Sequence, residues 1–133
     1  MGIAPTNIVG KKILLVDDDI SFTQLYSAVF DAKGFNFSIA KDGPEALAKA
    51  RAEKPSLILL DIMMPGMDGF QVLKQLRLNP STATIPVWMV TNLSEQINQQ
   101  TARSLGATDY IVKATATPNQ VCDRIIDYFS KAA

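Results

Sequence analysis

Short runs of apolar residues recur along the chain, and each is followed by a segment with a helical pattern. Residues 13–16, 57–60 and 86–90 are apolar at almost every position, which is typical of strands buried on both faces of a sheet. Residues 35–39 alternate apolar and polar side chains, as a less buried strand does, and a fifth strand is predicted at 109–112. These five runs are the predicted strands.

The segments between the strands carry apolar residues at helical spacing. The first predicted helix has the apolar set Phe22, Leu25, Tyr26, Val29 and Phe30, and the last begins at about Pro118. The weakest pattern lies at residues 95–105, where few apolar residues stand among Gln, Asn, Thr and Ser. Strict strand–helix alternation indicates parallel strands, right-handed crossovers and helices on both faces. We therefore predict an α/β fold with an open, doubly wound, five-stranded parallel sheet of the flavodoxin-like (βα)5 kind, in strand order 2-1-3-4-5.

Length and composition place this fold in one domain. The chain has 133 residues, of which 47% are hydrophobic, enough for a single buried core. We expect that domain at residues 11–131 and a flexible lead-in at residues 1–10. The lead-in lacks the charged start and long apolar block of a signal peptide, and it fits a myristoylation pattern only superficially. No apolar stretch approaches the roughly 18 residues of a membrane span, so a cytoplasmic location is expected.

The charged and reactive residues exclude several classes of function. Thirteen Lys and Arg balance thirteen Asp and Glu, which argues against a basic surface for nucleic acid or membrane binding. The chain has no His, which removes Ser-His-Asp and Cys-His catalysis and histidine metal sites. Its single Cys cannot form an intrachain disulfide or a Cys-rich zinc site. Trp88 and Cys122 are interpreted as core residues.

Polar side chains follow four of the predicted strands. Asp17 and Asp18 end the first strand, Asp61 the third, Thr91 the fourth and Lys113 the fifth. In open α/β sheets, ligands bind outside the carboxyl ends of the strands, where the strand order reverses. For the order 2-1-3-4-5 this point lies between the first and third strands, so three carboxylates should meet there.

Three clustered carboxylates repel one another unless a counter-charge is present. A hard cation with oxygen ligands supplies it, and Mg²⁺ commonly binds one or two carboxylates together with phosphate oxygens. Lys113 adds an ammonium group and Thr91 a hydroxyl group. These parts suit the transfer of a phosphoryl group onto Asp61. The bland interpretation of the same segment is a strand-end turn with a helix cap, which is the role expected for Asp19.

This arrangement resembles the receiver domain of the response regulators of two-component signalling systems. The resemblance rests on Thr91 and on the segments KILLVDDD, LILLDIMMPGMDGF and GATDYIVK. It implies that a sensor histidine kinase or a histidine phosphotransfer protein phosphorylates Asp61. It also implies that Mg²⁺ is held by the side chains of Asp17, Asp18 and Asp61 and by the backbone carbonyl of Met63.

The resemblance further implies how the signal is read. Thr91 and Lys113 would bind the phosphoryl oxygens, and Tyr110 would change rotamer on activation, although it is also readily interpreted as a half-buried strand aromatic. The face formed by residues 95–105, 109–112 and the last helix would then change its affinity for a downstream protein. No direct nucleic acid contact and no membrane contact are expected of this chain. The protein would assist its own phosphorylation and dephosphorylation without being a separate enzyme.

Three residues depart from the family pattern. Receivers usually have Pro after the last-strand lysine, often with a cis bond, whereas this chain has Ala114, so a trans bond is expected. Asn92 follows Thr91 where Ala or Gly is usual, and its amide could narrow access to Asp61 or hold a water there. The bulky side chain of Met63 could hinder attacking water at the same entrance.

Two further functions remain open at this point. Ala114 and Asn92 motivate a receiver-like interaction module that works without phosphorylation. A small phosphatase with an aspartate nucleophile and Mg²⁺ is a third hypothesis, although 133 residues leave little for a substrate cap. Flavin binding is disfavoured, because a flavin phosphate needs a loop of N–H groups and hydroxyls where this chain has Asp17, Asp18 and Asp19.

Overall fold

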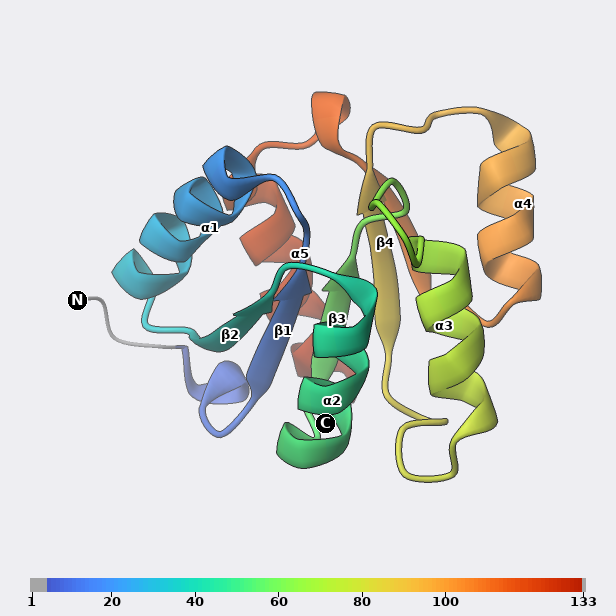
Figure 1. Ribbon diagram of the computed structural model, residues 1–133. Coiled ribbons are helices and arrows are strands. Elements are labelled where there is room, and N and C mark those ends of the chain that lie inside the picture. Colours follow the sequence, from blue (N-terminus) through green and yellow to red (C-terminus); the bar gives the residue numbers. More distant parts are fainter. Residues whose placement is uncertain (1–4, 133) are drawn as a thin grey trace.

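The computed structural model describes residues 5–132 and shows a parallel sheet between two layers of helices (Figure 1). The sheet has five strands in the order β2-β1-β3-β4-β5, and all four neighbouring pairs are parallel. The strands are β1 (Lys12–Val16), β2 (Asn36–Ala40), β3 (Leu57–Leu60), β4 (Val87–Thr91) and β5 (Asp109–Val112). The predicted fold class and strand order are confirmed.

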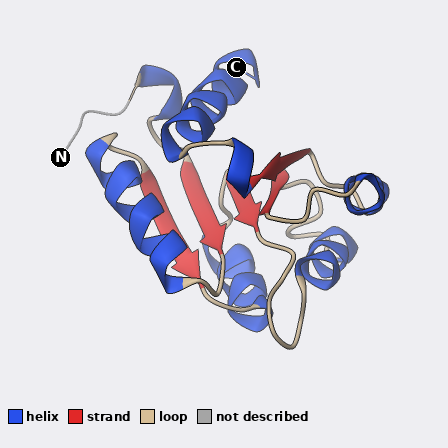
Figure 2. Ribbon diagram, turned by 90° about the horizontal axis from the view of Figure 1, so that it is seen from above, coloured by secondary structure: helices blue, strands red, loops and turns tan. Residues whose placement is uncertain are grey.

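Helices cover both faces of the sheet (Figure 2). One face carries α1 (Ile20–Ala32), α5 (Pro118–Ala132) and the short 3-10 helix η1 (Thr6–Ile8). The other carries α2 (Gly43–Glu53), α3 (Gly69–Leu78) and α4 (Gln96–Ser104). A second 3-10 turn, η2 (Lys113–Thr115), joins β5 to α5. Within residues 5–132, no helix has both the length and the apolar character that a bilayer crossing requires.

The central strands explain the fully apolar runs of the sequence. Leu14 and Val16 of β1 point into the cluster under α2, α3 and α4, whereas Ile13 and Leu15 point into the cluster under α1 and α5. Successive residues of a strand face opposite sides of the sheet, so a strand that is covered on both sides must be apolar throughout. Trp88 and Cys122 are buried in the α1–α5 cluster, as expected.

Aspartates fix the starts of three helices. Asp19 accepts a hydrogen bond from the backbone N–H of Phe22 and caps α1, as predicted. Asp42 caps α2 in the same way, and Asp68 forms a capping box with Gln71 at the start of α3. These caps set where each helix begins relative to the preceding strand, and therefore where the loops at the carboxyl edge of the sheet run.

Strand β2 begins one residue later than the sequence predicts. The alternating pattern places Phe35 in the strand, but in the structure its N–H donates to the carbonyl of Phe30 and closes the end of α1. Gly34 makes this turn with φ 75°, a left-handed conformation that favours glycine. The cap therefore takes the first apolar residue of the alternating run, and the strand starts at Asn36.

Part of the expected lead-in is packed onto the domain. Residues Thr6–Ile8 form η1, Ile8 is only 2% exposed, and the amide of Asn7 donates to the carbonyl of Ile126 in α5. The flexible lead-in at residues 1–10 remains a prediction, and the pattern of ten residues does not reveal these contacts of Asn7 and Ile8 beside α5. Residues 1–4, which carry most of the myristoylation pattern, lie outside the described residues.

Candidate functional site

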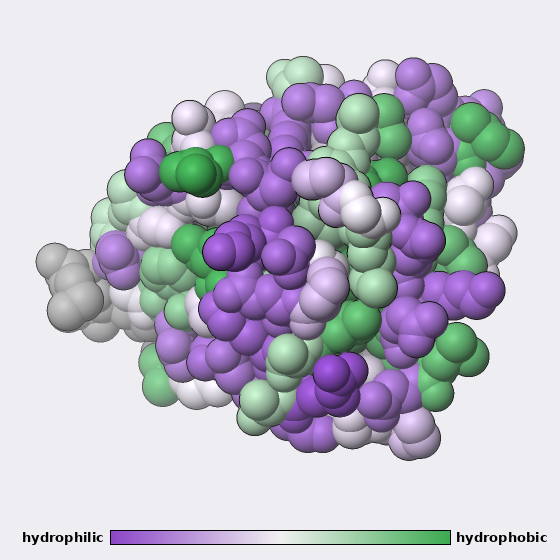
Figure 3. All heavy atoms as spheres, viewed as in Figure 1, coloured by the Kyte–Doolittle hydropathy of each residue, from purple (hydrophilic) through white to green (hydrophobic). Residues whose placement is uncertain are grey.

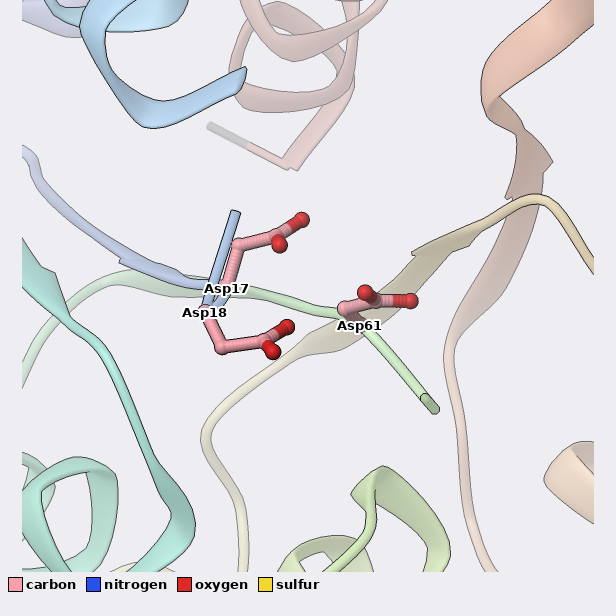
Figure 4. A group of neighbouring side chains, drawn as sticks. All are labelled: Asp17, Asp18 and Asp61. Carbon is pink, nitrogen blue, oxygen red and sulfur yellow. The ribbon is translucent and has the colours of Figure 1, made fainter. Parts of the chain in front are cut away.

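Three carboxylates meet where β1 and β3 end (Figure 4). Asp17 and Asp18 follow β1, and Asp61 follows β3, which lies beside β1 with Val16 opposite Leu60. Each residue offers one carboxylate oxygen, and these oxygens all lie within 4.8 Å of one another. The sheet register therefore brings together the acids that the sequence predicts at the point where the strand order reverses.

The acids differ in burial. Asp17 is 2% and Asp61 5% exposed, whereas Asp18 lies at the surface. Burial raises the pKa of Asp17 above its ordinary value, and the negative charge of Asp61 acts in the same direction. Contacts with Lys113 and with the backbone N–H of Asp19 oppose that rise. The net rise in the pKa of Asp17 is therefore caused mainly by its removal from water, which Lys113 and the N–H of Asp19 offset only in part.

The donor set fits a hard divalent cation. All candidate side-chain ligands are oxygens, and the Oδ2 of Asp17 is buried without a hydrogen bond of regular geometry. Oxygen–oxygen separations of this size require only small side-chain movements to surround an ion of the size of Mg²⁺. The peptide of Met63 lies beside the site, because its N–H donates to Oδ1 of Asp61 at 3.4 Å.

Lys113 supplies the positive charge closest to these acids. Its Nζ lies 2.7 Å from Oδ2 of Asp17 and 3.4 Å from Oδ2 of Asp61. Burial lowers the pKa of Lys113, but the contact with Asp17 and the charges of both aspartates outweigh this effect and leave that pKa above its ordinary value. The ammonium group is therefore retained at the site as a charged group.

Thr91 and Tyr110 lie on the other side of the site, on β4 and β5. Thr91 is fully buried at the end of β4, and its Oγ1 accepts a long hydrogen bond of 3.4 Å from the N–H of Leu93. Tyr110 is half-buried, and its hydroxyl donates to the carbonyl of Leu93 at 2.6 Å. Burial raises the pKa of Tyr110, as do the nearby negative charges of Glu95 and Asp61. Leu93 thus links the predicted hydroxyl ligand to the predicted switch residue.

The residues that depart from the family pattern lie around this site. Residues 5–132 contain no cis peptide bond, so Lys113–Ala114 is trans, as expected, and the chain turns there through η2. Asn92 is exposed and shares a groove with Lys113 and Ala114. The side chain of Met63 is 61% exposed.

One contact of the site is absent from the sequence prediction. The ring of Phe22, in the first turn of α1, has the Nζ of Lys113 4.1 Å from its centroid. Periodicity identified Phe22 only as part of the apolar face of a helix. The available signal was its place one turn beyond Asp18, on a helix that begins at the acidic edge.

Comparison with known proteins gives consistent matches in sequence. Residues 13–126 match the family model described as the response regulator receiver domain. The alkaline phosphatase synthesis transcriptional regulatory protein PhoP of Bacillus subtilis is 40% identical over 117 residues, which are 88% of this chain and 48% of PhoP. The response regulator PleD of Caulobacter vibrioides is 42% identical over 105 residues, 79% of this chain and 23% of PleD. The chain therefore spans about half or less of these curated relatives.

Solved structures of similar size match over most of their length. The chemotaxis protein CheY4 of Vibrio cholerae gives a TM-score of 0.80 at 33% identity, with 86% of this chain and 95% of that chain covered. The BeF3-activated N-terminal receiver domain of Klebsiella pneumoniae RstA gives 0.81 at 31% identity, with 90% and 98% covered. These matches and the acidic site at the strand ends show that the chain belongs to the response regulator receiver domains of two-component systems.

Proposed function

We propose that Asp61 is the phosphoacceptor of this receiver and that Asp17, Asp18, Thr91 and Lys113 serve its phosphorylation. The observation that carries the proposal is the buried carboxylate of Asp61, which lies within 4.8 Å of two further carboxylates and beside the Lys113 ammonium. A sensor histidine kinase or a histidine phosphotransfer protein would donate the phosphoryl group. The carboxylate oxygen of Asp61 would form the new O–P bond as the P–N bond of the donor breaks, and the bonding electron pair would return to the imidazole nitrogen.

The acids would hold Mg²⁺ through Asp17, Asp18, Asp61 and the backbone carbonyl of Met63. When bound, the ion supplies positive charge that lets an anionic phosphoryl group approach a carboxylate. The chain itself contributes the fixed geometry, because the strand ends of β1 and β3 and the cap at Asp19 hold the three acids in place.

Lys113 and Thr91 would bind the phosphoryl oxygens from two sides. The Nζ of Lys113 lies only 3.4 Å from Oδ2 of Asp61, so it can reach an oxygen attached to that carboxylate with a small movement away from Asp17. The hydroxyl of Thr91 makes only one long contact, with the N–H of Leu93, and is available to reorient. Both groups would stabilise charge on the transferred group.

The contacts of Leu93 with Thr91 and Tyr110 support the proposed switch. Thr91 ends β4 and Leu93 follows two residues later, where its N–H donates to Oγ1 of Thr91 and its carbonyl accepts a hydrogen bond from the hydroxyl of Tyr110. A shift of Thr91 towards Asp61 would disturb that acceptor and free Tyr110 to change rotamer. The face made by α4, β5 and α5 would then change its affinity for a downstream protein.

The experiment is an intact-mass measurement after treatment with acetyl phosphate, with and without Mg²⁺. We expect the wild type to gain the mass of one phosphoryl group only when Mg²⁺ is present, and Asp61→Asn to gain none. Asp123→Asn is the matched control, because Asp123 is an exposed aspartate on α5 that does not belong to the group of Asp17, Asp18 and Asp61. A wild type that gains no mass, or an Asp61→Asn variant that gains as much, would contradict the proposal.

The same proteins test the phosphorylation-independent module, which predicts partner binding that Asp61→Asn leaves unchanged. A phosphatase would instead release phosphate from a general phosphate ester with repeated turnover.

The proposal further places the protein in the cytoplasm and gives it no separate enzymatic activity and no direct nucleic acid contact. Its Mg²⁺ dependence and its downstream protein partner are part of the same proposal.

A further inference from the structure

The ammonium of Lys113 is enclosed from two directions. The carboxylates of Asp17 and Asp61 lie on one side, at 2.7 Å and 3.4 Å from Nζ. The ring of Phe22 lies on another, with its centroid 4.1 Å from the same atom. A cation at this distance from an aromatic centroid is attracted by the negative face of the ring. Lys113 therefore bridges the acidic site and helix α1.

The ring of Phe22 is itself held in place. Its centroid lies 4.5 Å from that of Tyr26, one turn further along α1, and Tyr26 is buried against Phe30 with a centroid distance of 5.7 Å. The start of α1 is also tied to the site, because the N–H of Asp19 donates to Oδ1 of Asp17 at 2.9 Å. The ring is thus presented by a helix whose position depends on the same strand end as the acids.

Without the ring of Phe22, the side chain of Lys113 could also point away from the carboxylates. A groove beside the site is lined by Phe22, Asn92, Lys113 and Ala114, among others, and it opens towards solvent. The four-carbon stem of lysine is flexible, and a hydrated ammonium is stable in such a groove. The face of the Phe22 ring occupies one side of this path and favours the orientation towards the carboxylates.

We propose that Phe22 is a positioning residue for phosphoryl transfer: its ring holds the Lys113 ammonium at the acidic site, ready for the phosphoryl oxygens. This inference rests on the proposed function, in which Lys113 binds a phosphoryl oxygen on Asp61. It assigns to the first turn of α1 a part in setting the rate of the reaction. Phe22 acts through Lys113 and need not touch the phosphoryl group.

The kinetic test uses acetyl phosphate with Mg²⁺, so that no docked protein donor contributes. We expect Phe22→Leu and Phe22→Met to lower the maximal rate of Asp61 phosphorylation by about threefold to tenfold, the size of a partly desolvated cation–π contact. Phe22→Tyr keeps the aromatic face and should retain a rate within about twofold of the wild type. Phe37→Leu, at a half-buried aromatic of β2, is the control for a general loss of aromatic packing.

A double-mutant cycle separates positioning from a general structural role. If Phe22 acts through Lys113, Phe22→Leu should change the rate by less than about 1.5-fold in a Lys113→Ala background, because the two effects are not independent. An effect of Phe22→Leu that is equal in both backgrounds would overturn the inference. A rate for Phe22→Leu equal to that of the wild type would overturn it as well.

A spectroscopic test needs neither metal nor phosphoryl donor. The ε-methylene protons of Lys113 should show an upfield ring-current shift in the wild type, Phe22→Tyr and Phe37→Leu, and should lose it in Phe22→Leu. Absence of that shift in the wild type would overturn the inference on Phe22 but leave the proposed function standing. A wild type with the shift but without any phosphorylation of Asp61 would instead overturn the proposed function, and with it the role of Phe22 in transfer.

Discussion

Helices α1 and α4 lie on opposite faces of the sheet, α1 at the left and α4 at the right in Figure 1, and they are held to the domain very differently. Helix α1 begins at a capping aspartate and buries Thr23, Tyr26 and Phe30. Helix α4 has no side-chain cap at Glu95, and of its residues only Ala102 is buried. Ile97, in the first turn of α4, is 65% exposed. The space-filling view shows a small hydrophobic area at upper right, on the side where α4 lies in Figure 1 (Figure 3).

Under the proposed function, this difference in packing separates the phosphoryl-transfer site from its readout. The firmly packed helix α1 carries Phe22, whose ring lies against Lys113 beside the acids. A displacement of Lys113 by an ångström would slow the proposed phosphoryl transfer. The weakly packed side is connected to the site through Thr91, Leu93 and Tyr110. A segment with few buried apolar contacts can be moved by a small change in free energy. Under the proposed function, α1 thus supports the acceptor site and α4 belongs to the part that reports phosphorylation.

The largest effect is expected when the ammonium group of Lys113 is removed. Lys113→Ala should lower the rate of Asp61 phosphorylation by acetyl phosphate about a hundredfold, as the loss of one charge-stabilising donor does in other acyl- and phosphoryl-transfer sites. The measurement is the initial rate by intact mass at saturating Mg²⁺. Lys74→Ala, at an exposed lysine of α3, is the control and should match the wild type. A Lys113→Ala rate within twofold of the control, about 0.4 kcal/mol, would show that this ammonium group does not set the rate.

The second prediction tests the packing difference directly. Backbone amides in the middle of α4 should exchange with deuterated water at least about tenfold faster than those in the middle of α1, because local opening of α4 exposes little apolar surface. Native-state hydrogen exchange followed by NMR on the unphosphorylated protein measures both helices in one sample. Equal protection of the two helices would remove the basis of the comparison.

The sequence predicts the group of acids and Lys113 better than it predicts the contacts that connect this group to Tyr110 and α4. Apolar runs such as residues 13–16 and 57–60 identify buried strands, and the polar residue after each run then falls at one edge of the sheet. This reasoning located Asp17, Asp61 and Lys113 together, and the structure brings them together. The prediction succeeds because parallel strands translate position in the chain into position at an edge.

Contacts that depend on helix rotation or on a backbone group are not visible in the sequence. The position of Phe22 over Lys113 depends on how α1 is rotated against the sheet. The acceptor for Tyr110 is the carbonyl of Leu93, which any residue at that position would supply. The burial of Ile8 depends in the same way on the packing of η1 against the α1–α5 cluster. Each of these is a tertiary contact with no local pattern.

The third prediction concerns the link between the two sides. Tyr110→Phe removes the hydroxyl that donates to the carbonyl of Leu93 and should lower the free energy of unfolding by about 1 kcal/mol. NMR shifts should change along Leu93 and the start of α4, while α1 remains unaffected. Urea unfolding of the unphosphorylated protein measures the stability. Tyr128→Phe, on α5, controls for loss of a tyrosine hydroxyl away from this loop. Changes that spread equally to α1 would show that the two sides are not separately held.

The smallest effect on stability is expected for Glu53, which lies near the start of β1, away from the site. Its substitution serves as a reference for the predictions on α1 and α4. Glu53 accepts a hydrogen bond from Ser38 and pairs with Lys12 at 2.9 Å, and these contacts lower its pKa below the ordinary 4.5. The unfolded chain then binds a proton more readily, so the stabilisation is present above pH 4.5 and is lost as the pH falls through the lower folded-state pKa. Glu53→Gln should therefore lower the free energy of unfolding by about 0.5 kcal/mol at pH 7, and urea curves of variant and wild type should converge at acidic pH. A difference in stability that stays constant with pH would assign the effect of Glu53→Gln to packing. If the urea curves converge and hydrogen exchange in α1 and α4 is unchanged by the substitution, the contrast between these two helices is a property of the edge that carries the site.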